Sequence, residues 1–342
     1  MPDPSRRRLL QLSALLALTP RLQACAWAAA ADAGSARSAD APASPSALNA
    51  RSTAEHVTAG LDLSGKTMLV TGATSGLGYE TLRVLALRGA HVLATGRTLD
   101  KAQAACDRVT GDTTPLALDL ADFGSVVACA EAVNARGAPL DALICNAGIM
   151  ALPELEQVGG IEKQFVVNHL GHFLLVNRLL EPLLAAEQGR IVVVSSTAHR
   201  SAPAEGIQFD DLSGEQGYEP MTAYAQSKLA NGLFAFELSR RLEASAATSN
   251  ALHPGVIITN IVRHLPGWQQ AGAKLIARWF VKSVEQGAAT QCFLAAHPSI
   301  AQVTGQYFED CQPAEPSAQM RDAAMAARLW EVSEKLTRGY LA

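Results

Sequence analysis

The sequence predicts an α/β fold, a doubly wound parallel sheet in a single domain, from three observations. Apolar runs of strand length alternate with helical patterns along most of the chain. These runs are continuous rather than alternating, as expected of strands that have helices on both faces of their sheet. The first strand also leads through a glycine turn into a helix, within residues 67–88. This arrangement is typical of sheets that bind ligands beyond the carboxyl ends of their strands.

The glycine turn predicts an anion site. An apolar run, Met68–Val70, stops at Gly72, and Gly76 and Gly78 follow before a helical pattern over Tyr79–Arg88. Unpaired N–H groups and the helix dipole favour a pyrophosphate at such a helix start. The first glycine permits the turn, the second leaves room for phosphates, and the third allows the helix to pack closely on the strand. The spacing G-x-x-x-G-x-G departs from the G-x-G-x-x-G fingerprint, so a turn used only for chain reversal is the alternative.

The remaining elements are expected in a regular order. Strands are expected at His91–Gly96, Pro115–Leu120, Leu140–Cys145, Arg190–Val194 and Ser249–Leu252. Helices are expected at Leu99–Val109, Ala121–Arg136 (capped by Asp122 or Ala121), Ile161–Leu184 and Thr222–Leu242. The carboxyl ends of parallel strands meet at one edge of a sheet. We therefore expect one cleft to be lined by the residues that follow the strands: Gly72, Arg97, Asp119, Asn146, Ser196 and Pro254.

The N-terminus carries an export pattern. Ser5–Arg8 is basic and precedes the apolar run Leu12–Leu18, Pro20 ends that run, and A-x-A sites such as Ala26–Ala28 follow. The run is shorter than the roughly 20 residues that span a bilayer. We predict a twin-arginine signal peptide over residues 1–30, recognised by the twin-arginine export machinery, and a periplasmic or exported protein. A cytoplasmic protein with a basic, disordered start is the alternative.

Three further features complete the N-terminal part of this interpretation. Leu22–Cys25 resembles a lipoprotein cleavage box, although Gln23 is unusual there, so lipidation ranks second. Residues 31–51 are rich in Ala, Ser, Pro and Asp and are expected to form a disordered linker. The globular domain is then expected over residues 52–342.

Composition limits the function classes. The chain has 342 residues, 49% of them apolar, enough for a sizeable core, and a net charge of −4. Such a charge gives no basic footprint for nucleic acid. The spacing of the six cysteines fits neither a metal site nor a disulfide framework, and most are expected to be small buried apolar residues.

The residues after the second strand favour NADP over NAD. An NAD site usually has an acidic residue there to hold the ribose hydroxyls. The segment Thr95–Arg97 has no carboxylate, and Arg97 offers a forked, charge-assisted contact to a 2′-phosphate. A solvated surface arginine is the alternative. Asp119, after the third strand, can accept a hydrogen bond from the adenine amino group or cap the following helix.

Tyr224 and Lys228 are candidates for proton transfer. Their i, i+4 spacing places both on one face of a helix. A nearby ammonium is expected to lower the phenol pKa from its usual value of about 10. The phenol then exchanges a proton with a carbinol oxygen that Ser196 also holds, while the ammonium holds the nicotinamide ribose. An ordinary surface pair is the alternative. Asn168 is either a helix-packing amide or part of a bend whose water relays protons to Lys228.

Together these segments resemble the short-chain dehydrogenase/reductase family, in its single-domain branch. The matching segments are Thr71–Gly78, Asn146–Gly148, Asn168, Ser195-Ser196, Tyr224-x-x-x-Lys228 and Pro254-Gly255 followed by Thr259. The resemblance covers nearly everything from about residue 52 to about residue 310 and implies a Rossmann fold. It implies that Tyr224 is the general acid/base, assisted by Ser196, Lys228 and Asn168. It also implies cofactor contacts from Gly72, Thr74, Ser75, Gly76, Leu77, Gly78, Arg97, Asp119, Leu120, Asn146, Ala147, Gly148, Tyr224, Lys228, Pro254, Gly255, Ile257 and Thr259.

Finer features resemble the retinol-dehydrogenase-like branch, whose members act on varied, often lipophilic, alcohols and carbonyls. These features are Asp62–Lys66, Asn168–Phe173, Ser195–His199, His253–Val256 and Gly305–Phe308. Cys145 is a departure, because many members have asparagine there, and little consequence is expected.

The resulting hypothesis is an NADP-dependent oxidoreductase that interconverts an alcohol and its carbonyl. Its substrate is expected to be apolar and to meet residues 149–160, 200–221 and 260–282. One alternative is an exported, non-catalytic NADP-binding sensor or partner protein. Another is a sugar-nucleotide epimerase or dehydratase, against which the glycine spacing and the short region after Pro254 argue. The sequence leaves open the substrate, the reaction direction and whether the chain forms a homo-oligomer.

Overall fold

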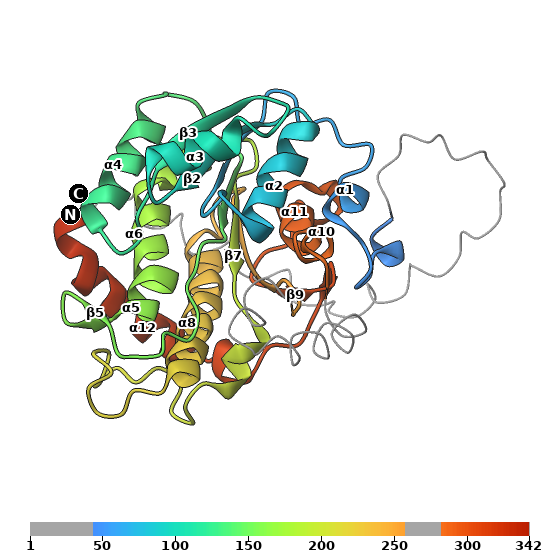
Figure 1. The fold of residues 1–342 in the computed structure, drawn as a ribbon. Helices are drawn as coiled ribbons and strands as arrows, with labels where there is room; N and C mark the ends of the chain where they lie inside the picture. Colours follow the sequence, from blue (N-terminus) through green and yellow to red (C-terminus); the bar gives the residue numbers. More distant parts are fainter. Residues whose placement is uncertain (1–43, 257–281, 342) are drawn as a thin grey trace, which may run out of the picture. The chain divides into compact units, whose positions relative to one another are not determined.

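The computed structural model describes residues 44–256 and 282–341. Its main sheet has eight strands in the order β10-β9-β8-β7-β4-β1-β2-β3 (Figure 1). Neighbouring strands are parallel except β9 and β10, which are antiparallel. The predicted doubly wound parallel sheet is therefore confirmed. Its strands are β1 (Thr67–Val70), β2 (His91–Gly96), β3 (Thr113–Ala117), β4 (Ala142–Cys145), β7 (Arg190–Val194), β8 (Thr248–His253), β9 (Tyr307–Glu309) and β10 (Gln312–Pro313).

The strand order reverses beside β1. The chain runs from β1 through β2 to β3 on one side, and then returns to place β4 on the other side of β1. Met68 of β1 is accordingly paired with Val92 of β2 on one side and with Ala142 of β4 on the other. Ligands of such sheets bind at the point where the order reverses. The carboxyl ends of β1 and β4 therefore mark the expected site.

Two hydrophobic cores lie on the two faces of the sheet, because successive side chains of a strand point to opposite faces. Leu69 and Leu143 belong to one core, and Val70 and Ile144 belong to the other. The first core is covered by α4 (Phe123–Asn134), α6 (Gly171–Arg178), α8 (Pro220–Arg241) and α12 (Ala323–Thr337) (Figure 1). The second is covered by α1 (Ala54–Val57), α2 (Gly76–Leu87), α3 (Leu99–Cys106) and α11 (Ala289–Ala296).

The long helix expected over Ile161–Leu184 begins later than predicted. Residues Ile161–Glu162 form β6, which pairs with β5 (Gln157–Val158) in a hairpin. The turn between them is Gly159-Gly160, and both glycines have positive φ angles of 59° and 80°, as a two-residue hairpin turn requires. The Glu162 carboxylate then accepts hydrogen bonds from the next N–H groups and caps α5 (Lys163–Phe165). The hairpin glycines and this cap set the later start.

The same segment is also interrupted internally. A π-helical turn, η3 (Val166–Leu170), follows α5, and α6 is separated from α7 (Leu180–Ala185) at Leu179. Pro182 has no N–H to donate to the carbonyl of Arg178, which favours the second break. That carbonyl instead accepts a hydrogen bond from Asn134 Nδ2 at 3.1 Å. The prediction of one continuous helix was therefore wrong at two places.

The third strand also ends earlier than expected. The strand predicted at Pro115–Leu120 is β3, Thr113–Ala117. Beyond it the Asp119 carboxylate accepts a hydrogen bond from Ala121 N at 3.0 Å, which turns the chain away from the sheet. Asp122 caps α4 through Gly124 N, as one of the two predicted caps.

Residues 44–51 pack on the domain, although they fall within the linker expected over 31–51. Pro45–Ala47 form a 3₁₀ turn, η2, and Leu48 is 3% exposed. Gln312 Nε2, on the edge strand β10, donates hydrogen bonds to Pro45 O at 2.7 Å and to Leu48 O at 3.0 Å. The end of the expected linker is thus held by apolar burial and by two backbone contacts.

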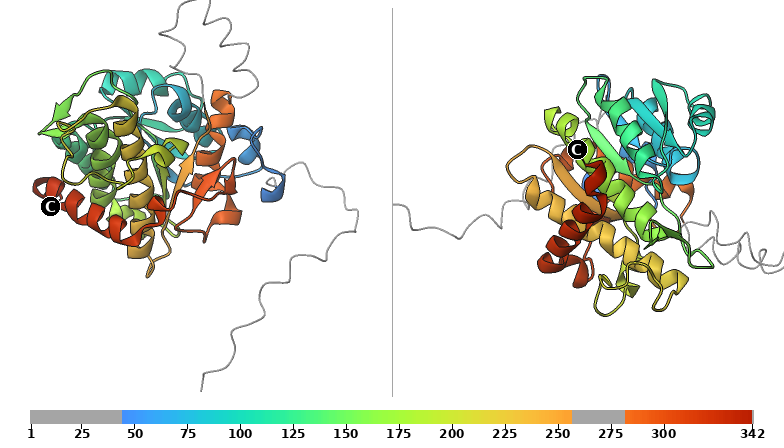
Figure 2. Two further views of the ribbon diagram at one scale, coloured as in Figure 1. Left: turned by 90° about the horizontal axis from the view of Figure 1, so that it is seen from below. Right: turned by 90° about the vertical axis from the view of Figure 1, so that its left-hand side faces the viewer.

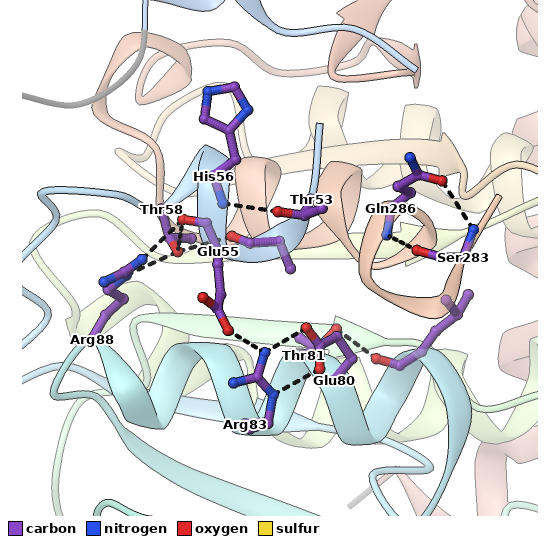
Figure 3. A network of polar contacts seen from close by, with 12 residues as sticks. Thr53, Glu55, His56, Thr58, Glu80, Thr81, Arg83, Arg88, Ser283 and Gln286 are labelled. Carbon is purple, nitrogen blue, oxygen red and sulfur yellow. Dashed lines mark hydrogen bonds and ion pairs between the residues drawn. The ribbon is translucent and has the colours of Figure 1, made fainter. Parts of the chain in front are cut away.

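An ion-pair network continues this attachment onto α2 (Figure 3). Arg83 of α2 bonds Glu55 of α1 at 2.6 Å and Glu80 of α2 at 2.8 Å. On the neighbouring helix α10 (Val284–Gly287), Ser283 and Gln286 form a capping box. Gln286 Nε2 also donates to Arg51 O at 3.4 Å. The segment before β1 therefore braces the helix that begins at the glycine turn.

Helix α12 lies over α6 and α8 (Figure 2), and its buried apolar residues belong to the first core. Its Trp330 stacks on Phe234 with ring centroids 5.8 Å apart and meets Phe173 edge to face at 5.0 Å. Arg241 lies 4.1 Å from the same indole ring. This helix was not predicted from the sequence, because its position depends on aromatic partners far away in the chain.

The five cysteines among the described residues are free and buried, at positions 106, 129, 145, 292 and 311. The prediction of small buried apolar side chains is confirmed for them. Burial raises the pKa of the Cys129 thiol to about 12 and keeps it protonated. None of the helices in the described part of the chain is long and apolar enough to cross a membrane.

Candidate active site

The start of α2 is shaped for an anion. Gly72 and Gly76 have positive φ angles of 67° and 56°, which favour glycine. Ser75 precedes the helix in an extended conformation, and its side chain makes no capping hydrogen bond. A Cβ on Gly76 would have no neighbour within 4 Å. The first N–H groups of α2 therefore have no side-chain cap, and there is open space beside Gly76, which together fit a pyrophosphate at this helix start.

Gly78 is required for a different reason. A Cβ at this position would lie 2.3 Å from Gly72 O and 2.5 Å from Asn146 Nδ2. The helix can approach the turn and the loop after β4 only because this side chain is absent. The close approach of α2 to the end of β1 is the packing role predicted for Gly78, the third glycine.

Thr71 joins the glycine turn to the Asn146–Gly148 loop. Its hydroxyl accepts hydrogen bonds from Asn146 N at 2.8 Å and from Ala147 N at 2.9 Å. Asn146 Nδ2 donates to Thr71 O at 2.8 Å. The predicted contact residues that follow β1 and β4 are thereby brought side by side.

Ser196, Tyr224 and Lys228 meet at the ends of β7 and α8. The Ser196 hydroxyl lies beside the Tyr224 phenol and favours the charged form of that phenol. Lys228 Nζ lies 5.6 Å from the centroid of the tyrosine ring and donates to Val194 O at 3.1 Å. Ser195 Oγ instead donates to Lys228 O at 2.7 Å, so this serine braces the helix. Of the two serines, the second therefore faces the phenol.

The expected lowering of the phenol pKa is not observed. Burial raises the pKa of Tyr224, and the neighbouring Ser196 hydroxyl only opposes that rise. Burial also lowers the pKa of the Lys228 ammonium to about 8. Both shifts have the same cause, because removing a group from water disfavours its charged form. The prediction of an acidified phenol was wrong, because the ammonium donates to Val194 O and burial dominates the pKa of the phenol.

Asn168 lies in the π-helical turn η3, and its amide is fully engaged. Oδ1 accepts from Ile149 N at 2.8 Å, and Nδ2 donates to Ile149 O and Ser227 Oγ, both at 2.9 Å. A Cβ on Gly148 would lie 3.1 Å from Asn168 Oδ1 and 3.5 Å from Lys228 Nζ. The amide therefore fixes the loop next to Lys228, which is the packing role weighed above. The water relay stays a prediction.

Arg97 follows β2 at the edge of the expected adenosine site. It is exposed and makes no hydrogen bond or ion pair with other described residues. A Cβ on Gly96 would lie 2.7 Å from Thr74 Cγ2, so this strand end lies against the glycine turn. The guanidinium is thus available to a ligand phosphate at that turn.

Asp119 and Leu120 lie beyond β3. The Asp119 carboxylate makes the turn to Ala121, and Asp122 is the cap of α4, so Asp119 does not cap the helix. Leu120 is buried, and a Cβ on Gly171 would lie 2.6 Å from its carbonyl oxygen. The adenine contact of Asp119 stays a prediction.

Pro254 and Gly255 follow β8. Gly255 has a φ of 98°, and a Cβ there would clash with Lys282 Cδ at 2.4 Å. Lys282 N donates to Val256 O at 3.0 Å. Ile257, Thr259 and most of the expected substrate region 260–282 lie outside the described residues.

Two buried histidines beside the site were not assigned a role from the sequence. His199 Nδ1 contacts Ser196 O at 2.5 Å, and its Nε2 accepts from Ser317 N at 3.0 Å. His172 contacts Thr71 and the carbonyl of Asn168. Both stand within segments that matched the family, and their signal was a histidine three or four residues after a predicted site residue, Ser196 or Asn168.

Comparisons with known proteins agree with this geometry. A family profile described as short chain dehydrogenase matches residues 66–270. The chain is 40% identical over 306 residues to the short-chain dehydrogenase TIC 32 A, chloroplastic, of Brassica napus, covering 86% of this chain and 95% of that protein. It is 40% identical over 290 residues to retinol dehydrogenase 14 of Homo sapiens, covering 79% and 85%. A solved Pseudomonas aeruginosa RhlG/NADP active-site complex is similar with a TM-score of 0.59 and 26% identity, covering 72% of this chain and 95% of that one.

Fold, site and comparisons together define an NAD(P)-dependent oxidoreductase. The chain belongs to the short-chain dehydrogenase/reductase family and is retinol-dehydrogenase-like within it. The predicted family and enzyme class are confirmed.

Proposed function

We propose that this protein is an NADP-dependent oxidoreductase that interconverts an alcohol and its carbonyl, with Tyr224 as general acid/base. The observation that carries the proposal is the contact of the Tyr224 phenol with Ser196, beside the buried Lys228. A phenol and a hydroxyl that lie side by side are suited to hold one substrate oxygen.

The side chains suggest how the reaction proceeds. When bound, NADPH supplies or NADP accepts the hydride. The phenol donates its proton to the carbonyl oxygen during reduction and accepts it back during oxidation. Burial raises the pKa of Tyr224, which keeps the phenol protonated at neutral pH, the form that reduction needs. Ser196 orients the same oxygen, and Lys228 holds the nicotinamide ribose.

The NADP preference is supported by the exposed Arg97 and by the absence of a carboxylate in Thr95–Arg97. A guanidinium pairs with a phosphate through parallel hydrogen bonds. RhlG, which resembles this chain, was solved with NADP.

An apolar substrate is supported by three exposed side chains, those of Met150, Met221 and Val256, on segments that adjoin the site. The first two segments are joined by Gln164, whose amide accepts from Ala151 N and donates to Pro220 O. Retinol dehydrogenase 14 is named for a lipophilic alcohol, which agrees with this class.

The test is the variant Tyr224→Phe. Purified protein should oxidise NADPH with at least one member of a panel of apolar aldehydes and ketones. The variant should lose about 10²-fold or more of that turnover and still bind NADPH in a fluorescence titration. Tyr340→Phe, which removes an exposed phenol from the C-terminal turn, serves as the control and should keep full activity. Unchanged turnover in Tyr224→Phe would exclude the mechanism.

A second candidate is an exported, non-catalytic NADP-binding sensor, favoured by the basic and apolar pattern of residues 5–18. Protein that retains a non-exchanging cofactor during purification and turns over none of the panel would support it.

Export itself is proposed from the same residues. Residues 1–50 fused to a folded reporter should carry it to the periplasm, and replacing Arg6 and Arg7 by lysine should stop this. Retention of the unaltered fusion in the cytoplasm would contradict export.

A further inference from the structure

His172 lies in the first turn of α6 and connects two parts of the site. The side chain is 1% exposed. Its Nδ1 lies 3.0 Å from Asn168 O, in the π-helical turn, and its Nε2 lies 2.9 Å from Thr71 Oγ1, at the end of β1. The proposed mechanism does not use this imidazole.

The partners determine the direction of both hydrogen bonds. A carbonyl oxygen can only accept, so Nδ1 carries the proton. Burial lowers the pKa of His172 to about 4, so the ring is neutral near pH 7 and Nε2 has a free lone pair. The Thr71 hydroxyl therefore donates its proton to Nε2.

This donation orients the Thr71 hydroxyl. Its lone pairs then point to Asn146 N and Ala147 N, which donate to it at 2.8 Å and 2.9 Å. Ile144 O, at 3.2 Å, is a more distant alternative acceptor for the hydroxyl proton. Without the imidazole, the hydroxyl would turn toward that carbonyl or lose a partner.

Three segments that adjoin the proposed cofactor site thus share one buried contact. They are the start of the glycine turn, the Asn146–Gly148 loop, and the π-helical turn whose Asn168 amide holds Ile149. Both ring nitrogens of His172 are bonded to these segments, whereas the equally buried His169 has no partner at Nδ1 among the described residues.

We propose that His172 is a positioning residue which, through the Thr71 hydroxyl, holds the Asn146–Gly148 loop in the position that binds the dinucleotide. The inference rests on the proposed function. The imidazole touches neither substrate nor cofactor, and it acts by orienting a hydroxyl that in turn orders two backbone N–H groups.

Two substitutions separate the two hydrogen bonds of the imidazole, one at each ring nitrogen. His172→Gln places an amide near the position of Nε2 and keeps an acceptor for Thr71. His172→Asn places an amide near Nδ1 and keeps the donor to Asn168 O but loses the contact to Thr71. Hydrogen exchange at the amides of Asn146 and Ala147, measured by mass spectrometry on the free protein, reports the loop without any turnover.

We expect exchange in the Asn variant to be about fivefold faster or more than in the Gln variant. NADPH binding, measured by fluorescence titration, should weaken by a similar factor, and KM for NADPH should rise more than kcat falls. His169→Gln is the matched control, because His169 is equally buried in the preceding turn but contacts Ser333 of α12. It should lower the melting temperature and leave loop exchange unchanged.

Equal exchange and equal NADPH affinity in the two His172 variants would overturn the inference, whether both were altered or neither was. If neither variant folded, nitrogen NMR of the His172 ring in the unaltered protein would decide, together with loop exchange in Thr71→Val and Thr71→Ser. The inference requires a neutral ring that is protonated at Nδ1 and accepts at Nε2. That tautomer, with faster exchange in Thr71→Val than in Thr71→Ser, supports the inference, and the opposite tautomer or equal exchange overturns it. If the unaltered protein showed no NADPH turnover but the two His172 variants still differed in loop exchange, the proposed function would be refuted and the role of His172 would stand.

Discussion

Lys228 is a buried ammonium, and its burial costs the folded state stability. Burial lowers the pKa of Lys228 to about 8 from its ordinary value of 10.5. At about 1.4 kcal/mol per pKa unit, the charged form costs the folded state about 3 kcal/mol below pH 8. As the pH rises from about 8 to about 10.5, the unfolded state retains the proton longer, so this penalty shrinks and stability rises.

We therefore predict that Lys228→Met abolishes turnover and stabilises the free protein by about 2 kcal/mol at pH 7. The Val194 carbonyl keeps a donor in Asn231 Nδ2 at 3.0 Å, so the substitution orphans no acceptor. The stabilisation by Lys228→Met should fall by pH 10 to less than half of its value at pH 7. Urea unfolding at both pH values measures it, with the exposed Lys101→Met as control. A gain that does not change with pH would show that the lysine is not desolvated.

In the proposed NADP site, Arg97 is the residue expected to pair with the 2′-phosphate. A charge-assisted pair with a 2′-phosphate is worth about 1.5 to 3 kcal/mol, or about 10- to 100-fold in affinity. We predict that Arg97→Ala weakens NADPH binding by this factor and changes NADH binding by less than about twofold. Lys101→Ala, a neighbouring exposed cation, is the control for general loss of charge. Equal losses for both cofactors would remove Arg97 from the phosphate site.

At the scale of elements, the approach of α2 to β1 depends on Gly78. A Cβ would overlap Gly72 O, a backbone atom that cannot turn aside. We predict that Gly78→Ala destabilises the protein by about 3 kcal/mol and weakens dinucleotide binding. Gly339→Ala, where a Cβ meets nothing within 4 Å, should change stability by less than about 0.5 kcal/mol. Chemical denaturation compares the two, and a tolerated Gly78→Ala would mean that helix and turn are not packed together.

The sequence could predict the bounds of an element where neighbouring residues in the chain determine them. β2 and β7 were predicted at their observed bounds, because each is a continuous apolar run that ends at a glycine or a serine. The breaks between Ile161 and Leu184 were not predictable from periodicity. The π-helical turn inserts a residue without changing the apolar pattern, and the break at Leu179 depends on Pro182 and on Asn134 from another helix.

The site also has a part that could be predicted from the sequence and a part that could not. Tyr224, Lys228 and Ser196 were predictable, because a motif spacing and a strand end bring them together. The pKa direction of Tyr224 was not, because it depends on how deeply the phenol is buried. The role of Thr71 and His172 was also hidden, since their contact joins residues 101 positions apart.

At the scale of the whole molecule, residues 44–57, which precede β1, bind to the edge strand β10 and to helix α2. We call this segment the strap. Leu48 is buried, and Gln312 Nε2 donates to Pro45 O and Leu48 O. Glu55 pairs with Arg83 of α2 (Figure 3). The helix whose start faces the expected pyrophosphate is therefore braced from outside the motif that recognises it.

This strap predicts how the protein tolerates shortening. A chain that begins at Ser44 should keep full stability, because all the contacts described for the strap lie after that residue. A chain that begins at Ser52 loses the burial of Leu48 and leaves the Gln312 amide without its partners, at a combined cost of about 3 kcal/mol. For a domain of this size that lowers the melting temperature by about 6 °C. Gln312→Ala in the longer chain should cost about 1 kcal/mol, and in the shorter chain almost nothing, since the two changes remove the same contacts. Calorimetry on the four proteins measures the coupling, and equal melting temperatures for the two chain lengths would show that residues 44–51 add nothing to the fold.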